Sequence, residues 1–88
     1  MEGNMTSRQI KKFAAGIIDQ KLGLRVSSTD LTLVDAEEYT GDGGQDLLRA
    51  VDFYRNGFPF IRYSATFRYH EWKLLITDTR TDKELLIP

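Results

Sequence analysis

The chain has no cysteine, only one histidine and no long hydrophobic run among its 88 residues. The lack of cysteine excludes disulfide bonds, thiolate zinc sites and a thiol nucleophile, and it is typical of a cytoplasmic protein. No apolar segment approaches the roughly 18–20 residues that cross a bilayer, and the N-terminal segment lacks an apolar signal core. The net charge of −1 argues against a generally basic nucleic-acid-binding protein.

The composition fits one small globular domain. Hydrophobic residues make up 41% of the chain and charged residues 28%, which are ordinary fractions. A domain of this size has one core and buries roughly 60–65% of the surface that its unfolded chain exposes. We therefore expect a single domain over residues 1–88, with residues 1–5 disordered and no linker or internal repeat.

An amphipathic helix is predicted over residues 7–22. Thr6 and Gln9 have the spacing of a capping box, in which each side chain accepts a hydrogen bond from the main-chain N–H of the other residue. Gly23 suits the left-handed conformation that ends many helices. The apolar residues at helical spacing, which we expect to face the core, are Ile10, Phe13, Ala14 and Ile17.

The segment from Phe58 to Asp78 predicts a β-hairpin around which the rest of the chain is organised. Apolar and polar residues alternate over 61–69, the pattern of a strand with one buried and one exposed face. Beyond residue 70 the apolar residues occupy even instead of odd positions, which a two-residue turn at His70 and Glu71 explains. Because opposite residues share a face, the predicted cross-strand pairs are Tyr69–Trp72, Phe67–Leu74 and Ala65–Ile76.

Residues 45–55 fit either an amphipathic helix or a strand, and we favour the strand. Asn56-Gly57 after a β-prone run is a strong hairpin signal. A two-residue turn there would place Asp52 on the buried face, which counts against that register. A bulged turn would instead bring to the core side Leu47, Val51 and Phe53, but also Arg49.

Two shorter segments complete the predicted sheet. Residues 31–36 have an apolar, β-branched pattern, and residues 85–87 are expected to form a strand at the sheet edge. One helix laid on one face of such a sheet gives a two-layer architecture. The predicted fold class is α+β, with one N-terminal helix packed on a four- to five-stranded antiparallel sheet.

Charge is unevenly distributed along the chain. Residues 30–46 contain six acids and no base, whereas residues 49–73 contain five bases and two acids. Glycines at 41, 43 and 44 predict a flexible loop, and its acids could surround a hard cation such as calcium. Their spacing is not that of the helix-loop-helix calcium loop, so we expect a solvated loop without metal. The acidic-loop residues are Asp35, Glu37, Glu38, Asp42 and Asp46.

The polar face of the central hairpin is the second candidate site. By strand parity it carries the residues that we call the Arg-rich face, namely Arg62, Ser64, Thr66, Arg68 and Lys73. The predicted register sets Lys73 opposite Arg68, and like charges in that arrangement are destabilising. An anionic partner would relieve the repulsion, and nucleic acid is one such partner. However, the aromatic residues that would stack on bases fall on the buried face.

No catalytic site is predicted. His70 is the only histidine, and its expected place in an exposed turn offers neither a nucleophile nor an orienting group. No sequence motif calls for a cofactor. We therefore expect a non-catalytic interaction or regulatory module that binds a protein partner through a sheet edge, the Arg-rich face or the acidic loop. The alternative is a nucleic-acid-binding domain that uses the Arg-rich face.

Overall fold

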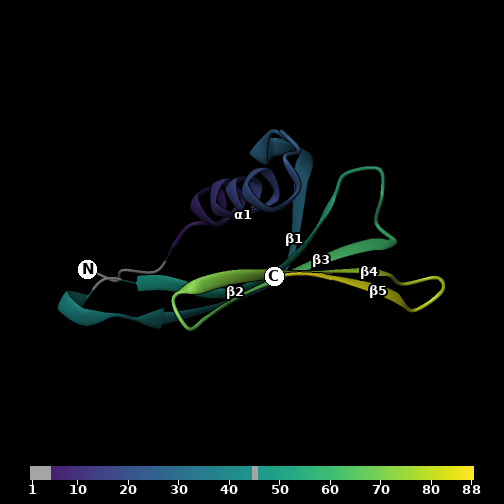
Figure 1. Ribbon diagram of the computed structural model, residues 1–88. Helices are drawn as coiled ribbons and strands as arrows, with labels where there is room; N and C mark the ends of the chain where they lie inside the picture. The colour runs from purple at the N-terminus through teal and green to yellow at the C-terminus, as the bar shows by residue number, and fades with distance from the viewer. Residues whose placement is uncertain (1–4, 45) are drawn as a thin grey trace.

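One helix packs on a five-stranded antiparallel sheet in the computed structural model, which describes residues 5–44 and 46–88 (Figure 1). The strands follow one another across the sheet in the order β1-β2-β3-β4-β5. The predicted α+β fold is therefore confirmed. The elements are α1 (Ser7–Leu22), η1 (Ser28–Asp30), β1 (Leu31–Thr40), η2 (Asp42–Gly44), β2 (Asp46–Arg55), β3 (Ile61–Arg68), β4 (Glu71–Asp78) and β5 (Lys83–Ile87).

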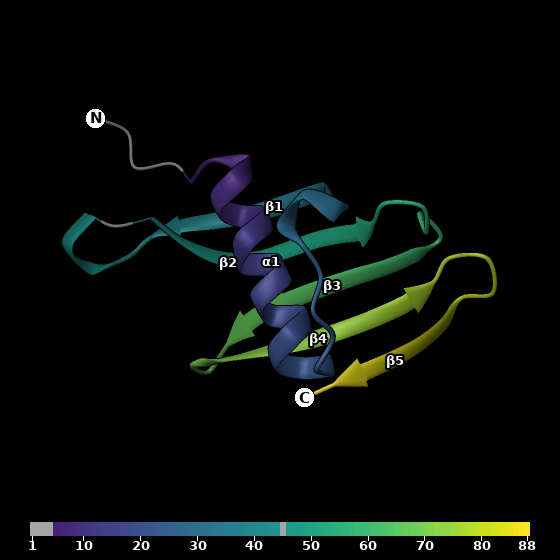
Figure 2. The same ribbon diagram turned by 90° about the horizontal axis from the view of Figure 1, so that it is seen from above.

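Helix α1 has the predicted bounds and the predicted caps. Thr6 and Gln9 form the capping box, and Gly23 adopts the left-handed conformation with φ of 65°. The helix lies across the strands and contacts β1, β2 and β4 (Figure 2). None of the helices in the described part of the chain is long and apolar enough to span a membrane.

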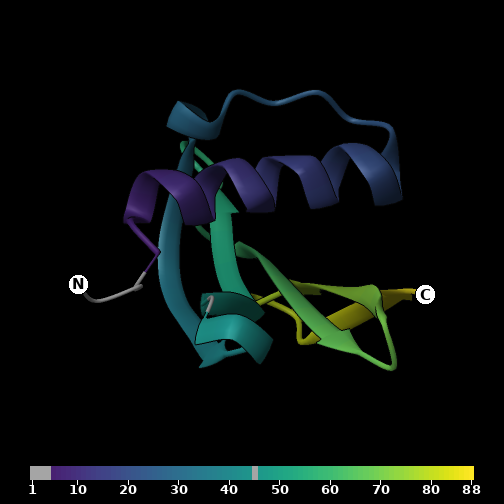
Figure 3. The same ribbon diagram turned by 90° about the vertical axis from the view of Figure 1, so that its left-hand side faces the viewer.

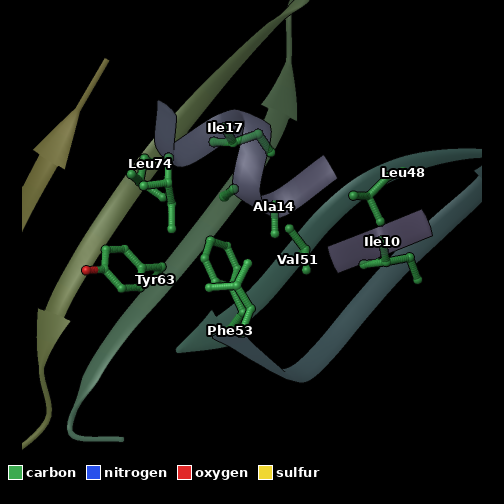
Figure 4. Close-up of a cluster of buried hydrophobic side chains, with 11 residues drawn as sticks. Ile10, Ala14, Ile17, Leu48, Val51, Phe53, Tyr63 and Leu74 are labelled. Carbon is green, nitrogen blue, oxygen red and sulfur yellow. The ribbon is translucent and has the colours of Figure 1, made fainter. Parts of the chain in front are cut away.

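The core lies between α1 and one face of the sheet (Figures 3 and 4). Phe53 is fully buried, and its ring stacks on that of Tyr63 at 5.4 Å between centroids. The helix contributes Ile18, which is fully buried, whereas Phe13 is 47% exposed. The prediction that Phe13 belongs to the core was therefore wrong. The buried stripe of α1 consists of Ile10, Ala14, Ile17 and Ile18.

The β3–β4 hairpin forms as expected, but its turn lies one residue earlier than predicted. Tyr69 and His70 make the turn, with φ of 56° and 64°, which is the geometry of a type I′ hairpin turn. The predicted pairs were wrong, and Tyr69 is 83% exposed and not buried. The register is displaced by two residues, an even number, so the faces of the sheet are as predicted. The observed pairs include Phe67–Trp72, Ala65–Leu74 and Tyr63–Ile76.

Residues 46–55 form a strand, as favoured, and two β-bulges shape its pairing with β1. Val34 is the extra residue on β1, and Arg49 is the extra residue on β2. A bulge reverses which residues face the core, so Leu48 is buried while Leu47 and Arg49 are exposed. The prediction that Leu47 and Arg49 lie on the core side was wrong. It assumed that buried and exposed residues alternate along the whole strand, whereas the bulge at Arg49 interrupts that alternation.

The connections differ from the predictions mainly in length. Strand β1 extends to Thr40, beyond the predicted end at residue 36. Asn56-Gly57 forms a turn in which Phe58 N–H donates to Arg55 O at 2.9 Å, but the connection continues to Phe60 before β3 begins. Of the segment 1–5 that we expected to be disordered, residues 1–4 lie outside the described residues.

Candidate functional site

A hollow lies beside α1, which covers only part of the sheet (Figure 2). It has a volume of about 710 Å³, and we call it the α1 groove. An adjoining hollow of about 190 Å³ shares Met5, Phe13 and Trp72 with it and extends over the sheet. The α1 groove is lined by Met5, Gln9, Lys12, Phe13, Gly16, Ile17, Gln20 and Trp72.

Aromatic side chains from three elements meet at this groove. The ring of Trp72 on β4 lies 6.1 Å from that of Phe13 on α1 and 5.3 Å from that of Phe67 on β3. The cross-strand pairing of Phe67 with Trp72 brings the two sheet residues together. At the start of α1, Met5 is held by its main-chain N–H, which donates to Glu38 Oε1 at 2.8 Å.

Large apolar side chains that line the α1 groove and the adjoining hollow remain partly exposed. Phe13 is 47% exposed, Leu47 41% and Tyr39 38%. The last two line the adjoining hollow together with Phe67 and Trp72. Contiguous apolar patches of this kind mark interaction sites in soluble proteins, whereas single exposed apolar residues do not.

Lys12 is the one charged residue among the described residues that line the α1 groove, and the carboxylate of Glu38 lies next to the groove, bonded to the main-chain N–H of Met5. A further hollow of about 470 Å³ shares Tyr39 and Phe67 with the hollow of about 190 Å³, and its other lining residues are Arg49, Arg68, Tyr69 and His70. Arg49 also faces Glu37 at 3.9 Å in an exposed ion pair, which contributes little to stability. No carboxylate lines any of these three hollows within residues 5–44 and 46–88.

The Arg-rich face lies on the side of the sheet opposite α1, as strand parity predicted. A hollow of about 390 Å³ is lined there by Ser64, Thr66, Arg68 and Lys73, together with Leu75 and Leu86. Lys73 is not directly opposite Arg68 as predicted, because Glu71 is opposite Arg68 and Lys73 is opposite Thr66. That part of the prediction was wrong because the turn is displaced by one residue.

Arg62 belongs to the same face but does not line the hollow. It pairs across β3 and β4 with Thr77. Its Nε is enclosed and has no hydrogen-bond partner among the described residues. One unsatisfied nitrogen on a partly exposed arginine does not define a ligand site.

The structure divides the predicted acidic loop between two faces of the sheet. Glu38 pairs with the core residue Leu48, whereas Asp35 and Glu37 lie on the face opposite α1, with Asp35 directly across from Asp52. Asp42 falls in η2, and Asp46 is the first residue of β2. Within the described residues, no three acidic or histidine side chains come together in a group that could hold a metal ion.

Two further polar features, the Asp78–Arg80 ion pair and His70, lie in the turns between strands. The Arg80 guanidinium binds both carboxylate oxygens of Asp78 at 3.0–3.1 Å, and this hydrogen bonding lowers the pKa of that carboxyl. The Arg80 side chain also lies over the ring of Phe60 at 3.8 Å, so the pair organises the β4–β5 turn. His70, the second residue of the β3–β4 turn, is exposed.

No family model, curated protein or solved structure matches this chain.

Sequence reasoning missed the α1 groove because it assigned Phe13 and Trp72 to a continuous core. One signal in the sequence pointed the other way. Each helical residue turns the side chain by about 100°, and including Ile18 in the apolar stripe moves its centre away from Phe13. Phe13 then lies at the margin of the stripe, where an aromatic ring has no covering element.

Proposed function

We propose that this protein is a non-catalytic interaction module that binds a protein partner in the α1 groove. The observation that supports the proposal is the apolar hollow lined by Phe13 and Trp72, together with the adjoining hollow that Tyr39 and Leu47 line over the sheet. Burial of apolar area there would contribute about 25 cal/mol per Å² before the costs of association. Aromatic side chains in such a depression are the usual anchors of protein interfaces.

The nucleic-acid alternative has weaker support. Stacking on bases needs aromatic rings among the cationic side chains, but no aromatic residue is among the described residues that line the hollow of the Arg-rich face. The opposite face also carries Asp35, Asp52 and Glu71 among its bases, which would repel phosphates. A cytoplasmic location, expected from the absence of cysteine, belongs to the same proposal.

The test uses two phenylalanines that differ in position but are similarly exposed. Phe13 lies in the α1 groove, whereas Phe58, which is half-exposed, lies in the β2–β3 connection. Phe13→Gln removes the aromatic wall of the groove, and Gln is well tolerated in a helix. Phe58→Gln is the matched control. Partners are captured from source-cell extract with wild-type, Phe13→Gln and Phe58→Gln baits, with and without nuclease, and each captured protein is purified and its affinity measured.

The proposal predicts a partner whose affinity falls at least about tenfold with Phe13→Gln and is unchanged with Phe58→Gln or nuclease. A fourth bait, which carries two substitutions on the Arg-rich face, tests the nucleic-acid alternative. If binding requires nucleic acid and is lost with Arg62→Ala and Arg68→Ala together, the protein is a nucleic-acid-binding module and the groove proposal is wrong. Equal affinity of a purified partner for the wild-type chain and Phe13→Gln would also contradict it.

A further inference from the structure

We infer that the outer edge of β5 pairs antiparallel with the same edge of a second copy of the chain, so that the two sheets join around a two-fold axis at Leu86. This surface is separate from the α1 groove, and the inference does not depend on the proposed function. It is drawn from the difference between the two edges of the sheet and from the residues that β5 exposes.

The edge formed by β1 is protected against pairing. Val34 is an extra residue that interrupts the ladder of β1 with β2. The strand also carries three acids, Asp35, Glu37 and Glu38. Bulges and charged side chains on an edge strand are the features that hinder the addition of another strand. A second copy of β1 would also bring its own acids against these three.

The edge formed by β5 lacks these features within the described residues. Residues 83–87 all pair with β4, and the register does not shift. The strand is the last one in the sheet, and Figure 2 shows it at the margin. Main-chain N–H and C=O groups alternate in direction along a strand. Those of β5 that point away from β4 are therefore placed to pair with another strand.

The edge strand β5 exposes large apolar side chains on both faces of the sheet. Leu85 is opposite Ile76, on the face that packs against α1, whereas Leu86 is opposite Leu75, on the other face. The two leucines are 59% and 57% exposed. A strand laid along the edge would cover both leucines from the side, whereas a helix docked on the sheet would cover only one of them.

The sequence of β5 favours a second copy of itself in one register. In an antiparallel pair, opposite residues have main-chain groups of the same direction, so the two-fold axis passes through residue 84, 85 or 86. The first register sets Glu84 opposite Glu84, which is repulsive, and the second sets Glu84 opposite Leu86. The third sets Leu86 opposite Leu86 and Leu85 opposite Ile87. Only this third arrangement, the Leu86 register, pairs apolar residues with one another.

The charges near β5 agree with the Leu86 register. It sets Glu84 of the second copy opposite Pro88. Because Leu74 pairs with Ile87, the same register places Lys73 beside Pro88. Lys21 also lies there, since its Nζ donates to Pro88 O at 3.0 Å. Each Glu84 is therefore brought to the end of the other β5 that has two lysines, and such complementarity favours the antiparallel second copy.

Sedimentation of the wild-type chain from about 10 µM to about 1 mM tests the pairing. The paired edge is short beside the roughly 800 Å² per partner of stable dimers, so the dimer should appear only as concentration rises. Leu86→Lys sets two lysines opposite each other and should raise the dissociation constant at least about tenfold. Leu86→Glu should do the same, and an equimolar mixture of the two variants should restore the dimer. Val34→Lys, on the β1 edge, is the matched control and should leave the dimer unchanged.

A single thiol tests the register and remains informative if a charged variant does not fold. The chain has no cysteine, so Leu86→Cys can form a disulfide only with a second copy. Opposite residues of an antiparallel pair have Cα atoms about 4.5–5.5 Å apart, which suits a disulfide. Under mild oxidation, Leu86→Cys should cross-link at least about tenfold faster than Leu85→Cys or Val34→Cys. Both control positions are also partly exposed.

A wild-type chain that stays monomeric at about 1 mM, at the upper end of the tested range, would overturn the inference and leave the β5 edge to a strand of another protein. A dimer that persists unchanged in folded Leu86→Lys, or cross-linking of Leu86→Cys no faster than that of Val34→Cys, would also overturn it. Growth into larger oligomers would mean that β5 pairs with a different edge, because a two-fold contact closes at two copies. Dimers lost with Phe13→Gln would assign self-association to the α1 groove and not to β5.

Discussion

Two phenylalanine-to-alanine substitutions test the placement of the core. Phe53 on β2 is fully buried and stacks on Tyr63, whereas Phe13 on α1 is 47% exposed at the groove. The sequence alone favoured Phe13 as a core residue. The structure predicts that Phe53→Ala is far more destabilising than Phe13→Ala.

The magnitudes follow from burial. Truncating a buried phenylalanine costs about 3–5 kcal/mol, because the lost transfer free energy and the residual cavity add. Phe53 should reach this range, since its aromatic stacking is also lost. Full burial of a phenylalanine contributes about 1.5–3 kcal/mol. Phe13 buries roughly half of its surface and leaves no closed cavity, so its loss should be about 1–1.5 kcal/mol on the same scale.

The free energy of unfolding, measured by urea titration at 25 °C, distinguishes these values. A domain of this size has a total stability of about 4–13 kcal/mol, so Phe53→Ala removes a large share of it. If the variant does not fold, Phe53→Leu gives a smaller, measurable loss at the same position. The m-value should stay unchanged for Phe13→Ala. A loss of 3 kcal/mol or more for Phe13→Ala, estimated with the same scale, would mean that Phe13 is a core residue and that the groove is closed in solution.

Three further predictions concern single residues. Gly23→Ala should destabilise the chain by about 1 kcal/mol, because φ of Gly23 is 65°. Gly16 lies in the helix interior with free space around it, so Gly16→Ala should stabilise the chain by about 0.5–1 kcal/mol. The melting temperatures of the two variants should therefore shift in opposite directions. Tyr69→Asn should stabilise the β3–β4 turn by about 0.5–1 kcal/mol, because Asn tolerates positive φ better than an exposed tyrosine, and a lower melting temperature would contradict the turn geometry. The pKa of the Asp78 carboxyl should lie below its ordinary value, because the Arg80 side chain and main chain donate hydrogen bonds to it. The stability that this carboxylate contributes is fully present above the pKa of Asp78 in the unfolded chain and is lost as pH falls through the lowered pKa of the folded chain. An NMR titration in which Arg80→Ala leaves the pKa of Asp78 unchanged would refute the assignment.

The sequence by itself determined the type and order of the elements. Thr6, Gln9 and Gly23 fix the ends of α1 through local hydrogen bonds and one left-handed residue. The alternation over residues 61–68 fixes a strand and the face on which each side chain lies. These signals act within a few residues, so they can be interpreted without knowing what packs against them. They also placed the five residues of the Arg-rich face on the same side of the sheet.

The tertiary structure decided the register, the bulge and the groove. A hairpin whose register is displaced by two residues keeps the same faces, so parity could not distinguish a turn at Tyr69 and His70 from one at His70 and Glu71. The bulge at Arg49 depends on the partner strand β1. The exposure of Phe13 depends on where α1 crosses a sheet wider than one helix. An apolar residue has the same local signal whether a neighbouring element covers it or leaves it open, and only the packing of distant segments decides between the two.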